Sequence, residues 1–138
     1  TPIEDIQRRF TKKIIGLNKL SYEERLAITR LPSLEYRRLR GDMIETFKIV
    51  HGFYDKVTVC SLFQFNTFSN TRGHPFKLHK PTISTSKFAN FFTNRVINVW
   101  NNLPVNIVNA GTVNAFKNSL DRHWIAYMYK INLELISC

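Results

Sequence analysis

Apolar residues recur every three or four positions at the start of this chain. They form one stripe, which consists of Ile3, Ile6, Phe10, Ile14 and Leu17. A proline at position 2 and acidic residues at positions 4 and 5 suit the first turn of a helix, where an amide donor is dispensable and negative charge is favoured. The pattern predicts an amphipathic helix that runs to about Gly16 or Leu17, and a stripe of this kind normally faces a core.

A short second helix is predicted by its N-terminal residues. Ser21 and Glu24 have the spacing of a capping box, in which the hydroxyl and the carboxylate each satisfy a backbone N–H that has no partner within the helix. This helix should run to about Arg30, and Pro32 should end it.

A longer third helix is predicted between Ser33, which is a suitable N-cap, and Gly52. Its apolar residues fall on one face and consist of Tyr36, Leu39, Met43, Phe47 and Val50. Because glycine commonly follows the last residue of a helix, the position of Gly52 favours a helix end there.

Helical spacing is absent from residues 52–87. Asn, Ser, Thr, Gly and Pro interrupt this stretch, and Phe76 and Leu78 alternate with Lys and His neighbours. The composition is typical of loops, and the alternation favours one or two short strands.

Helical spacing returns in the last third of the chain. The fourth predicted helix carries Phe88, Phe92, Val96, Val99, Trp100 and Leu103, and it should stop at the cluster of Asn101, Asn102 and Pro104. Thr112 can cap a fifth helix, whose inward residues should be Val113, Phe116, Leu120, Trp124 and Tyr127. Residues 125–138 include a mildly apolar tail. The sequence therefore predicts a mainly α fold of about five helices in a single domain over residues 1–138.

The charge of the chain is strongly positive and unevenly distributed. The formal net charge is +10, with 20 Lys and Arg against 10 Asp and Glu. No carboxylate side chain occurs between Asp55 and Asp121, although that stretch contains seven basic residues. Surfaces that contact only solvent usually mix both signs, so this segregation favours a nucleic-acid partner over a merely basic solvated face.

Candidate phosphate contacts come from three parts of the chain. The first helix contains like-charge pairs four residues apart, which a bound anion would stabilise, although a solvated outer face is the alternative. The third helix contains two arginines without an acidic residue in helical reach, and the remaining cations belong to the middle that lacks acids. The full set is Arg8, Arg9, Lys12, Lys13, Arg37, Arg40, Arg72, Lys77, Lys80 and Arg95.

Aromatic residues lie among the cations of the middle, as single-stranded nucleic-acid binding requires, because an exposed ring can stack on a base of any sequence. Rings at helical spacing are expected in the core instead. Phe68 and Phe76 fall outside the predicted helices and are therefore the candidates for stacking.

Metal binding and catalysis find little support in the sequence. The potential zinc ligands are Cys60, His74, His79 and Cys138, but structural zinc sites usually bring paired ligands on tight turns. We predict no metal or other cofactor. No nucleophile elbow, phosphate-binding glycine loop or carboxylate cluster occurs, so we predict no enzymatic activity. No apolar run approaches the length of a membrane span, and two distant cysteines suit a reducing intracellular setting.

Four sequence blocks carry a family resemblance. The longest is SYEERLAITRLPSLEYRRLRGDMIETFKIVHG over residues 21–52, and the others are IEDIQRRFTKKIIGL, NTRGHPFKLHKP, and FFTNRVINVWNNLP followed by VNAFKNSLDRHW. Together they resemble the region downstream of the polymerase core in reverse transcriptases of non-LTR (LINE-type) retrotransposons of the jockey and chicken-repeat kind. The resemblance extends from Ile3 to Trp124.

The resemblance implies a C-terminal module of a longer polyprotein, whose parent enzyme copies RNA into DNA in the nucleus. The paired-aspartate metal site of a polymerase palm is absent from this sequence, so the module is expected to be non-catalytic and to help hold element RNA or target DNA. Two alternatives remain open. In one, the module docks on the polymerase core without touching nucleic acid; in the other, it is a decayed element remnant with no function of its own.

Overall fold

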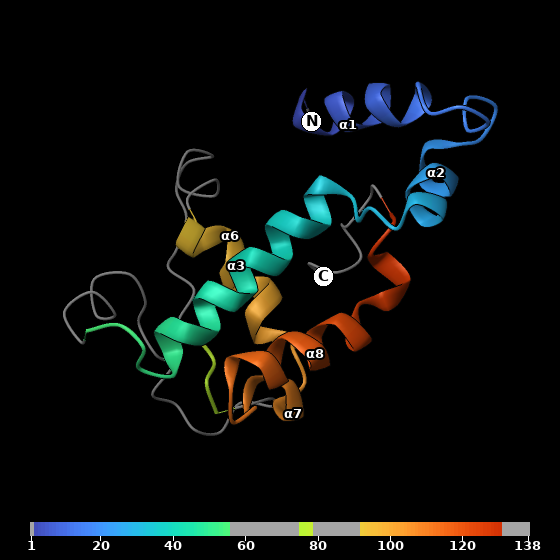
Figure 1. The fold of residues 1–138 in the computed structure, drawn as a ribbon. Helices are drawn as coiled ribbons and strands as arrows, with labels where there is room; N and C mark the ends of the chain where they lie inside the picture. The colour runs from blue at the N-terminus through green and yellow to red at the C-terminus, as the bar shows by residue number, and fades with distance from the viewer. Residues whose placement is uncertain (1, 56–74, 79–91, 131–138) are drawn as a thin grey trace.

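Helices dominate the part of the chain that is described in this computed structural model, namely residues 2–55, 75–78 and 92–130. With the labels of Figure 1 they are α1 (Pro2–Lys12), α2 (Tyr22–Thr29), α3 (Leu34–Val50), α6 (Phe92–Asn101), α7 (Val105–Val108), α8 (Val113–His123) and the short 3-10 helix η1 (Ile125–Tyr127). The predicted mainly α fold is confirmed. Within these described ranges no strand occurs, and Leu78 forms only an isolated β-bridge.

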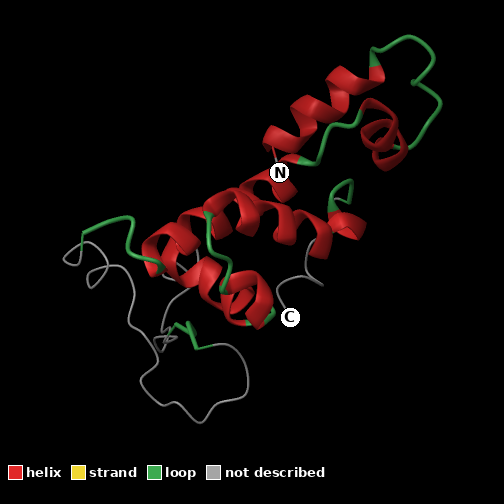
Figure 2. Cartoon of the chain, turned by 60° about the horizontal axis from the view of Figure 1, so that its bottom comes forward, coloured by secondary structure: helices red, strands yellow, loops and turns green. Residues whose placement is uncertain are grey.

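The hydrophobic core lies between α3, α6, α7 and α8. Figures 1 and 2 show α3 running through the middle of the molecule, while α1 and α2 form an arm at one end. The Phe47 ring of α3 stacks on Phe116 of α8 with 4.4 Å between ring centroids, and Trp100 of α6 lies 6.0 Å from Phe116. All three side chains are almost completely buried. Apolar side chains at helical spacing on three helices therefore meet in one core, as their pattern predicts.

Residues 75–78 are attached to the end of α6 by side chains. The Asn101 carboxamide accepts a hydrogen bond from the Leu78 N–H at 2.8 Å and donates one to the Leu78 carbonyl at 2.9 Å. The Trp100 indole N–H donates to the Phe76 carbonyl at 2.9 Å. Asn101 thus supplies the donor and the acceptor that a neighbouring strand would supply, which leaves Leu78 buried and paired.

Side-chain caps set the helix starts as the sequence predicts. The Ser21 hydroxyl accepts from the Glu24 N–H at 3.2 Å, and the Glu24 carboxylate accepts from the Ser21 N–H at 2.8 Å, so the capping box is complete. At the starts of α3 and α8 the Ser33 and Thr112 hydroxyls accept from the N–H three residues later, without a reciprocal carboxylate. These hydrogen bonds join residues three apart in sequence, which is why the local pattern reveals them.

Two elements differ from the sequence prediction. The first helix ends at Lys12 and does not reach Gly16. After Lys12 the chain continues through turns in which a carbonyl accepts a hydrogen bond from the third following N–H. Gly16 then adopts a φ of +86°, which a helix does not allow. The short helix α7 was not predicted: Pro104 is its N-cap, so the residue expected to end one helix also begins another.

Candidate nucleic-acid interface

Helix α1 turns its polar side inward and its apolar side outward. Glu4 and Thr11 are fully buried, whereas Ile3, Ile6 and Phe10 are 64%, 68% and 64% exposed. An amphipathic helix normally does the reverse, so the expectation that this stripe faces a core is wrong for these three residues. The arrangement requires polar partners on the neighbouring helices.

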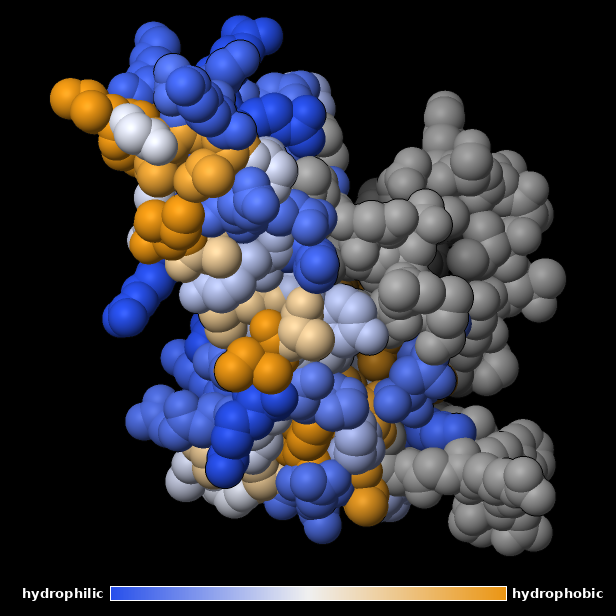
Figure 3. All heavy atoms as spheres, turned by 90° about the vertical axis from the view of Figure 1, so that its right-hand side faces the viewer, coloured by the Kyte–Doolittle hydropathy of each residue, from blue (hydrophilic) through white to orange (hydrophobic). Residues whose placement is uncertain are grey.

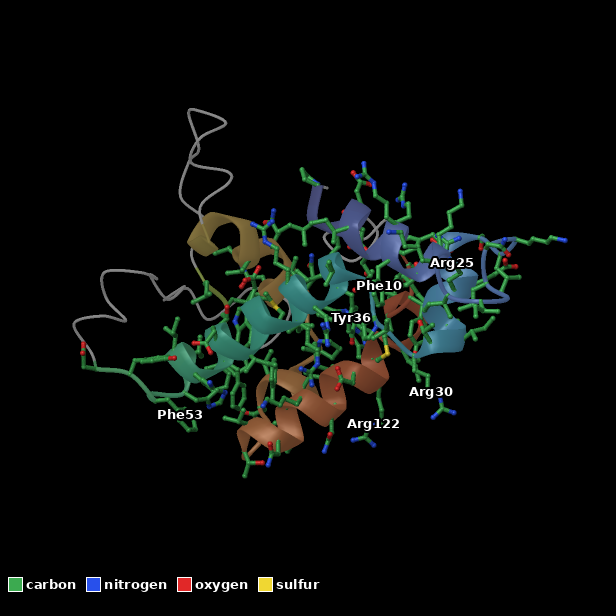
Figure 4. The ribbon with its side chains drawn as sticks, turned by 45° about the horizontal axis from the view of Figure 1, so that its top comes forward. Phe10, Arg25, Arg30, Tyr36, Phe53 and Arg122 are labelled. Carbon is green, nitrogen blue, oxygen red and sulfur yellow. The ribbon has the colours of Figure 1, made fainter. Side chains whose placement is uncertain are left out.

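Arg25 of α2 supplies two of these contacts. Its guanidinium is buried and donates to the Thr11 hydroxyl at 3.2 Å, to the Leu20 carbonyl at 2.6 Å and to the Arg8 carbonyl at 3.3 Å. Figure 4 shows Arg25 where α2 meets α1. A buried charged group is costly unless its donors are satisfied, and two of the three acceptors used here, Thr11 and Arg8, belong to α1. Arg25 therefore fixes which side of α1 faces inward.

Glu4 joins α1 to the other two helices of this region. Its carboxylate accepts a hydrogen bond from the Tyr22 hydroxyl of α2 and another from the Glu35 N–H, in the first turn of α3, at 3.1 Å. Gln7 donates to the Pro32 carbonyl at 3.1 Å, just before α3 begins. A carboxylate at a helix N-terminus satisfies a free N–H and interacts favourably with the helix dipole. The buried side of α1 is thus held by hydrogen bonds at both ends.

The outer side of α1 presents three cations. Arg9, Lys12 and Lys13 are exposed, and among the described residues their side chains make no hydrogen bond or ion pair. Lys12 lies three positions after Arg9 on the helix, and Lys13 directly follows the end of α1, so the three cations lie within about one turn of one another. Arg8 differs from them, because its guanidinium lies over the Tyr22 ring, 5.1 Å from the ring centroid. Figure 3 shows hydrophobic side chains gathered beside hydrophilic ones on the molecular surface.

The two arginines predicted as phosphate contacts on α3 have different surroundings. Arg37 is exposed. Arg40 instead forms a two-pronged ion pair with Asp121 of α8, with Nε–Oδ1 at 2.6 Å and Nη2–Oδ2 at 3.0 Å. The Tyr36 hydroxyl donates to the same carboxylate at 3.1 Å. Arg40 is thus engaged in joining α3 to α8, which argues against its assignment as a phosphate contact.

Two tyrosines in these networks make the free energy of unfolding depend on pH in the alkaline range. Burial raises the pKa of Tyr22 and of Tyr36 well above the ordinary value of 10.0, and the hydrogen-bonded carboxylates of Glu4 and Asp121 raise the pKa further. A tyrosine whose pKa is higher in the folded state than in the unfolded state stabilises the fold at any pH below the unfolded pKa. This contribution is lost as the pH rises past about 10, because the unfolded state then releases its proton first.

We therefore expect the urea midpoint to fall steadily above pH 10, and we expect Tyr36→Phe to reduce the slope of that fall. Tyr129→Phe, which removes a hydroxyl at a half-exposed position, is the matched control. An equal slope in wild type and Tyr36→Phe between pH 9 and 11.5 would contradict the role given to Tyr36.

Phe76 and Lys77 belong to the segment attached to α6. Phe76 is half-buried against the core, and its ring lies 4.7 Å from the His51 ring, centroid to centroid. This packing argues against base stacking by Phe76. Lys77 is half-buried beside it. The other predicted contacts of the middle, Arg72, Lys80 and the Arg95 side chain, lie outside the described part, as do Phe68 and the four potential zinc ligands.

Sequence reasoning missed the buried polar side of α1 and the exposure of Phe10. Glu4, Gln7 and Thr11 also recur at spacings of three and four, so a second, polar stripe was present beside the apolar one. This polar stripe was the available signal that the polar side faces inward. It could be interpreted only together with Tyr22 and Arg25, whose side chains donate the hydrogen bonds to it.

In the described ranges no three His, Cys, Asp or Glu side chains are grouped as a metal site would require, and no helix there is long and apolar enough to cross a membrane. No protein-family model matches the sequence, and comparison with curated proteins and with solved structures finds no match either.

Proposed function

We propose that this chain is a non-catalytic accessory module of a non-LTR retrotransposon RNA-directed DNA polymerase, and that it holds element RNA or target DNA through the outer side of α1. One observation carries the proposal: Arg9, Lys12 and Lys13 are exposed neighbours without an acidic partner in the described part of the chain. Like charges at this spacing destabilise a helix slightly, and phosphates placed between them would remove the repulsion.

The buried side of α1 supports this use of its outer side. Hydrogen bonds from Arg25, Tyr22 and the Glu35 N–H hold the helix in one orientation, so the cations are arranged before a ligand arrives. Cations fixed in this way lose less conformational freedom on binding than cations on a mobile segment. The net charge of +10 adds long-range attraction for any polyanion.

We expect the triple variant Arg9→Gln, Lys12→Gln and Lys13→Gln to bind a 12-nucleotide single strand at least tenfold more weakly at about 100 mM salt, because three phosphate contacts are removed. The slope of log affinity against log salt should fall by about 2, at roughly 0.7 for each phosphate of a single strand. Fluorescence anisotropy across a salt series measures both quantities, with RNA, DNA and duplex DNA compared.

The matched control removes the same charge elsewhere, by Arg30→Gln, Lys117→Gln and Arg122→Gln. Figure 4 shows Arg30 and Arg122 pointing away from α1. This control should change the affinity by less than about threefold if contact rather than net charge decides binding. Equal losses in both triple variants would contradict the assignment to α1.

A second function is favoured by the exposed stripe of Ile3, Ile6 and Phe10. Contiguous exposed apolar side chains are typical of surfaces that bind another protein, and the polymerase core of the parent polyprotein would be the partner. In that case the module positions the core and does not touch nucleic acid. Failure of the folded wild-type chain to bind any of the three nucleic acids at low salt would favour this docking function.

A further inference from the structure

We propose that Phe10 is a stacking platform for one unpaired nucleobase, with Lys13 and Arg9 beside it to hold the adjoining phosphates. The inference rests on the proposed nucleic-acid function and adds the class of ligand, which is a single strand with accessible bases. It also replaces Phe76 as the stacking residue, since that ring packs on His51.

The ring of Phe10 is presented to solvent by a helix that cannot turn it inward. Phe10 is 64% exposed, while Thr11, the next residue, is fully buried and accepts a hydrogen bond from Arg25. Rotation of α1 to bury Phe10 would break this bond and the bonds of Glu4. Figure 4 shows Phe10 on α1, near the end of the helix that leads into the α1–α2 connection.

The cations lie where a nucleotide stacked on this ring would place its phosphates. The Lys13 N–H donates to the Phe10 carbonyl at 3.0 Å, which keeps Lys13 within one turn of the ring, and Arg9 directly precedes Phe10. Both cations are exposed and lie within one turn of the exposed ring, so a nucleotide stacked on Phe10 would have its phosphate near them. Aromatic rings flanked by cations are the usual way in which proteins bind single strands without sequence preference.

Charge complementarity favours a nucleotide over two other ligands of an exposed apolar face, namely a second copy of this chain and an apolar groove of another protein. A second copy of the chain would bring the same three cations to the contact and would be repelled. An apolar groove on a protein would accept a leucine as readily as a phenylalanine. A nucleotide presents a flat base that stacks on the aromatic face, and its phosphate brings the negative charge that Arg9, Lys12 and Lys13 lack in the described structure.

Two oligonucleotides of equal charge test the inference: a labelled 12-nucleotide oligo-dT and an abasic strand of the same length. We expect wild type to prefer oligo-dT by about tenfold, since stacking on one ring accounts for a difference of that size. Phe10→Leu should lose this preference while it keeps its affinity for the abasic strand. Phe53→Leu is the control, because Phe53 is 60% exposed and lies far from α1 in Figure 4.

A fluorescent variant gives an independent measurement. Trp100 and Trp124 are buried, so the indole introduced by Phe10→Trp is the exposed one among the described tryptophan positions. Addition of oligo-dT should quench it and protect it from acrylamide, whereas the abasic strand should do neither. Quenching by both strands alike would overturn the inference.

Other outcomes separate the inference from the function on which it rests. Unchanged binding of oligo-dT by Phe10→Leu would overturn stacking, while loss of binding in the Arg9, Lys12 and Lys13 variant would still support the proposed function. If folded wild type binds neither strand, stacking is overturned; if it also fails to bind RNA and duplex DNA at low salt, the proposed function fails as well, and the apolar stripe becomes a surface for another protein.

Discussion

Replacement of Trp100 by alanine is expected to lower the free energy of unfolding by about 3–5 kcal/mol. The side chain is completely buried between α3, α6 and α8, and its indole N–H is bonded to the Phe76 carbonyl. Alanine would leave a cavity beside Phe116 and also an acceptor without its donor, and both changes are destabilising. Urea unfolding followed by far-ultraviolet circular dichroism gives this value from the midpoint and the slope.

Two further substitutions separate the contributions at this site. Trp100→Phe retains much of the volume but loses the donor, so it should cost about 1–2 kcal/mol. Val105→Ala, at a half-exposed position of α7, should change stability by less than about 0.5 kcal/mol. A loss below about 1 kcal/mol for Trp100→Ala would contradict the packing of α6 against the other helices.

Glu4→Ala is the second substitution with a large expected effect, about 2–4 kcal/mol. It removes the acceptor of the buried Tyr22 hydroxyl and of the partly buried Glu35 N–H. It also removes a negative group from the N-terminus of α3. Hydrogen exchange should report the loss chiefly as faster exchange in α1 and in the first turn of α3.

Asp5→Ala is the matched control, because the two acids are adjacent in the same helical turn. Asp5 is exposed and approaches Arg8 only at 3.9 Å, so its removal should change the free energy of unfolding by less than about 0.5 kcal/mol. Glu4→Gln keeps the shape of the side chain and one acceptor, and an intermediate loss is expected. Equal effects of Glu4→Ala and Asp5→Ala would show that α1 is not held as described.

The sequence predicts those features that depend on neighbouring residues. The caps of α2, α3 and α8 are confirmed because each joins a hydroxyl to an N–H three residues later. The inward residues predicted for α3 and for the fifth helix lie in or against the core, although α8 ends at His123 and Tyr127 belongs to η1. Local chemistry therefore suffices for most helix starts and for the identity of the main core.

Features that depend on distant residues could not be predicted in this way. Arg40 has no acid within reach on its own helix, and Asp121, its partner, lies 81 residues away. The orientation of α1 depends on Tyr22 and Arg25 of the next helix, because burial of their polar groups outweighs burial of the Ile6 side chain. The binding assignments of Arg40 and Phe76 are disfavoured because each side chain has a partner inside the fold, and the sequence did not reveal either partner.

The distance between Arg40 and Asp121 along the chain also bears on the order of folding. Residues of α1, α2 and α3 leave the ribosome well before Asp121 and Met128, whose carbonyl accepts a hydrogen bond from the Ser33 N–H. Contacts between distant residues form only after the chain between them has been made, and their closure slows folding. The arm that presents Phe10 can therefore form early through its own hydrogen bonds, but it reaches its final position relative to the core only when α8 and η1 have been synthesised.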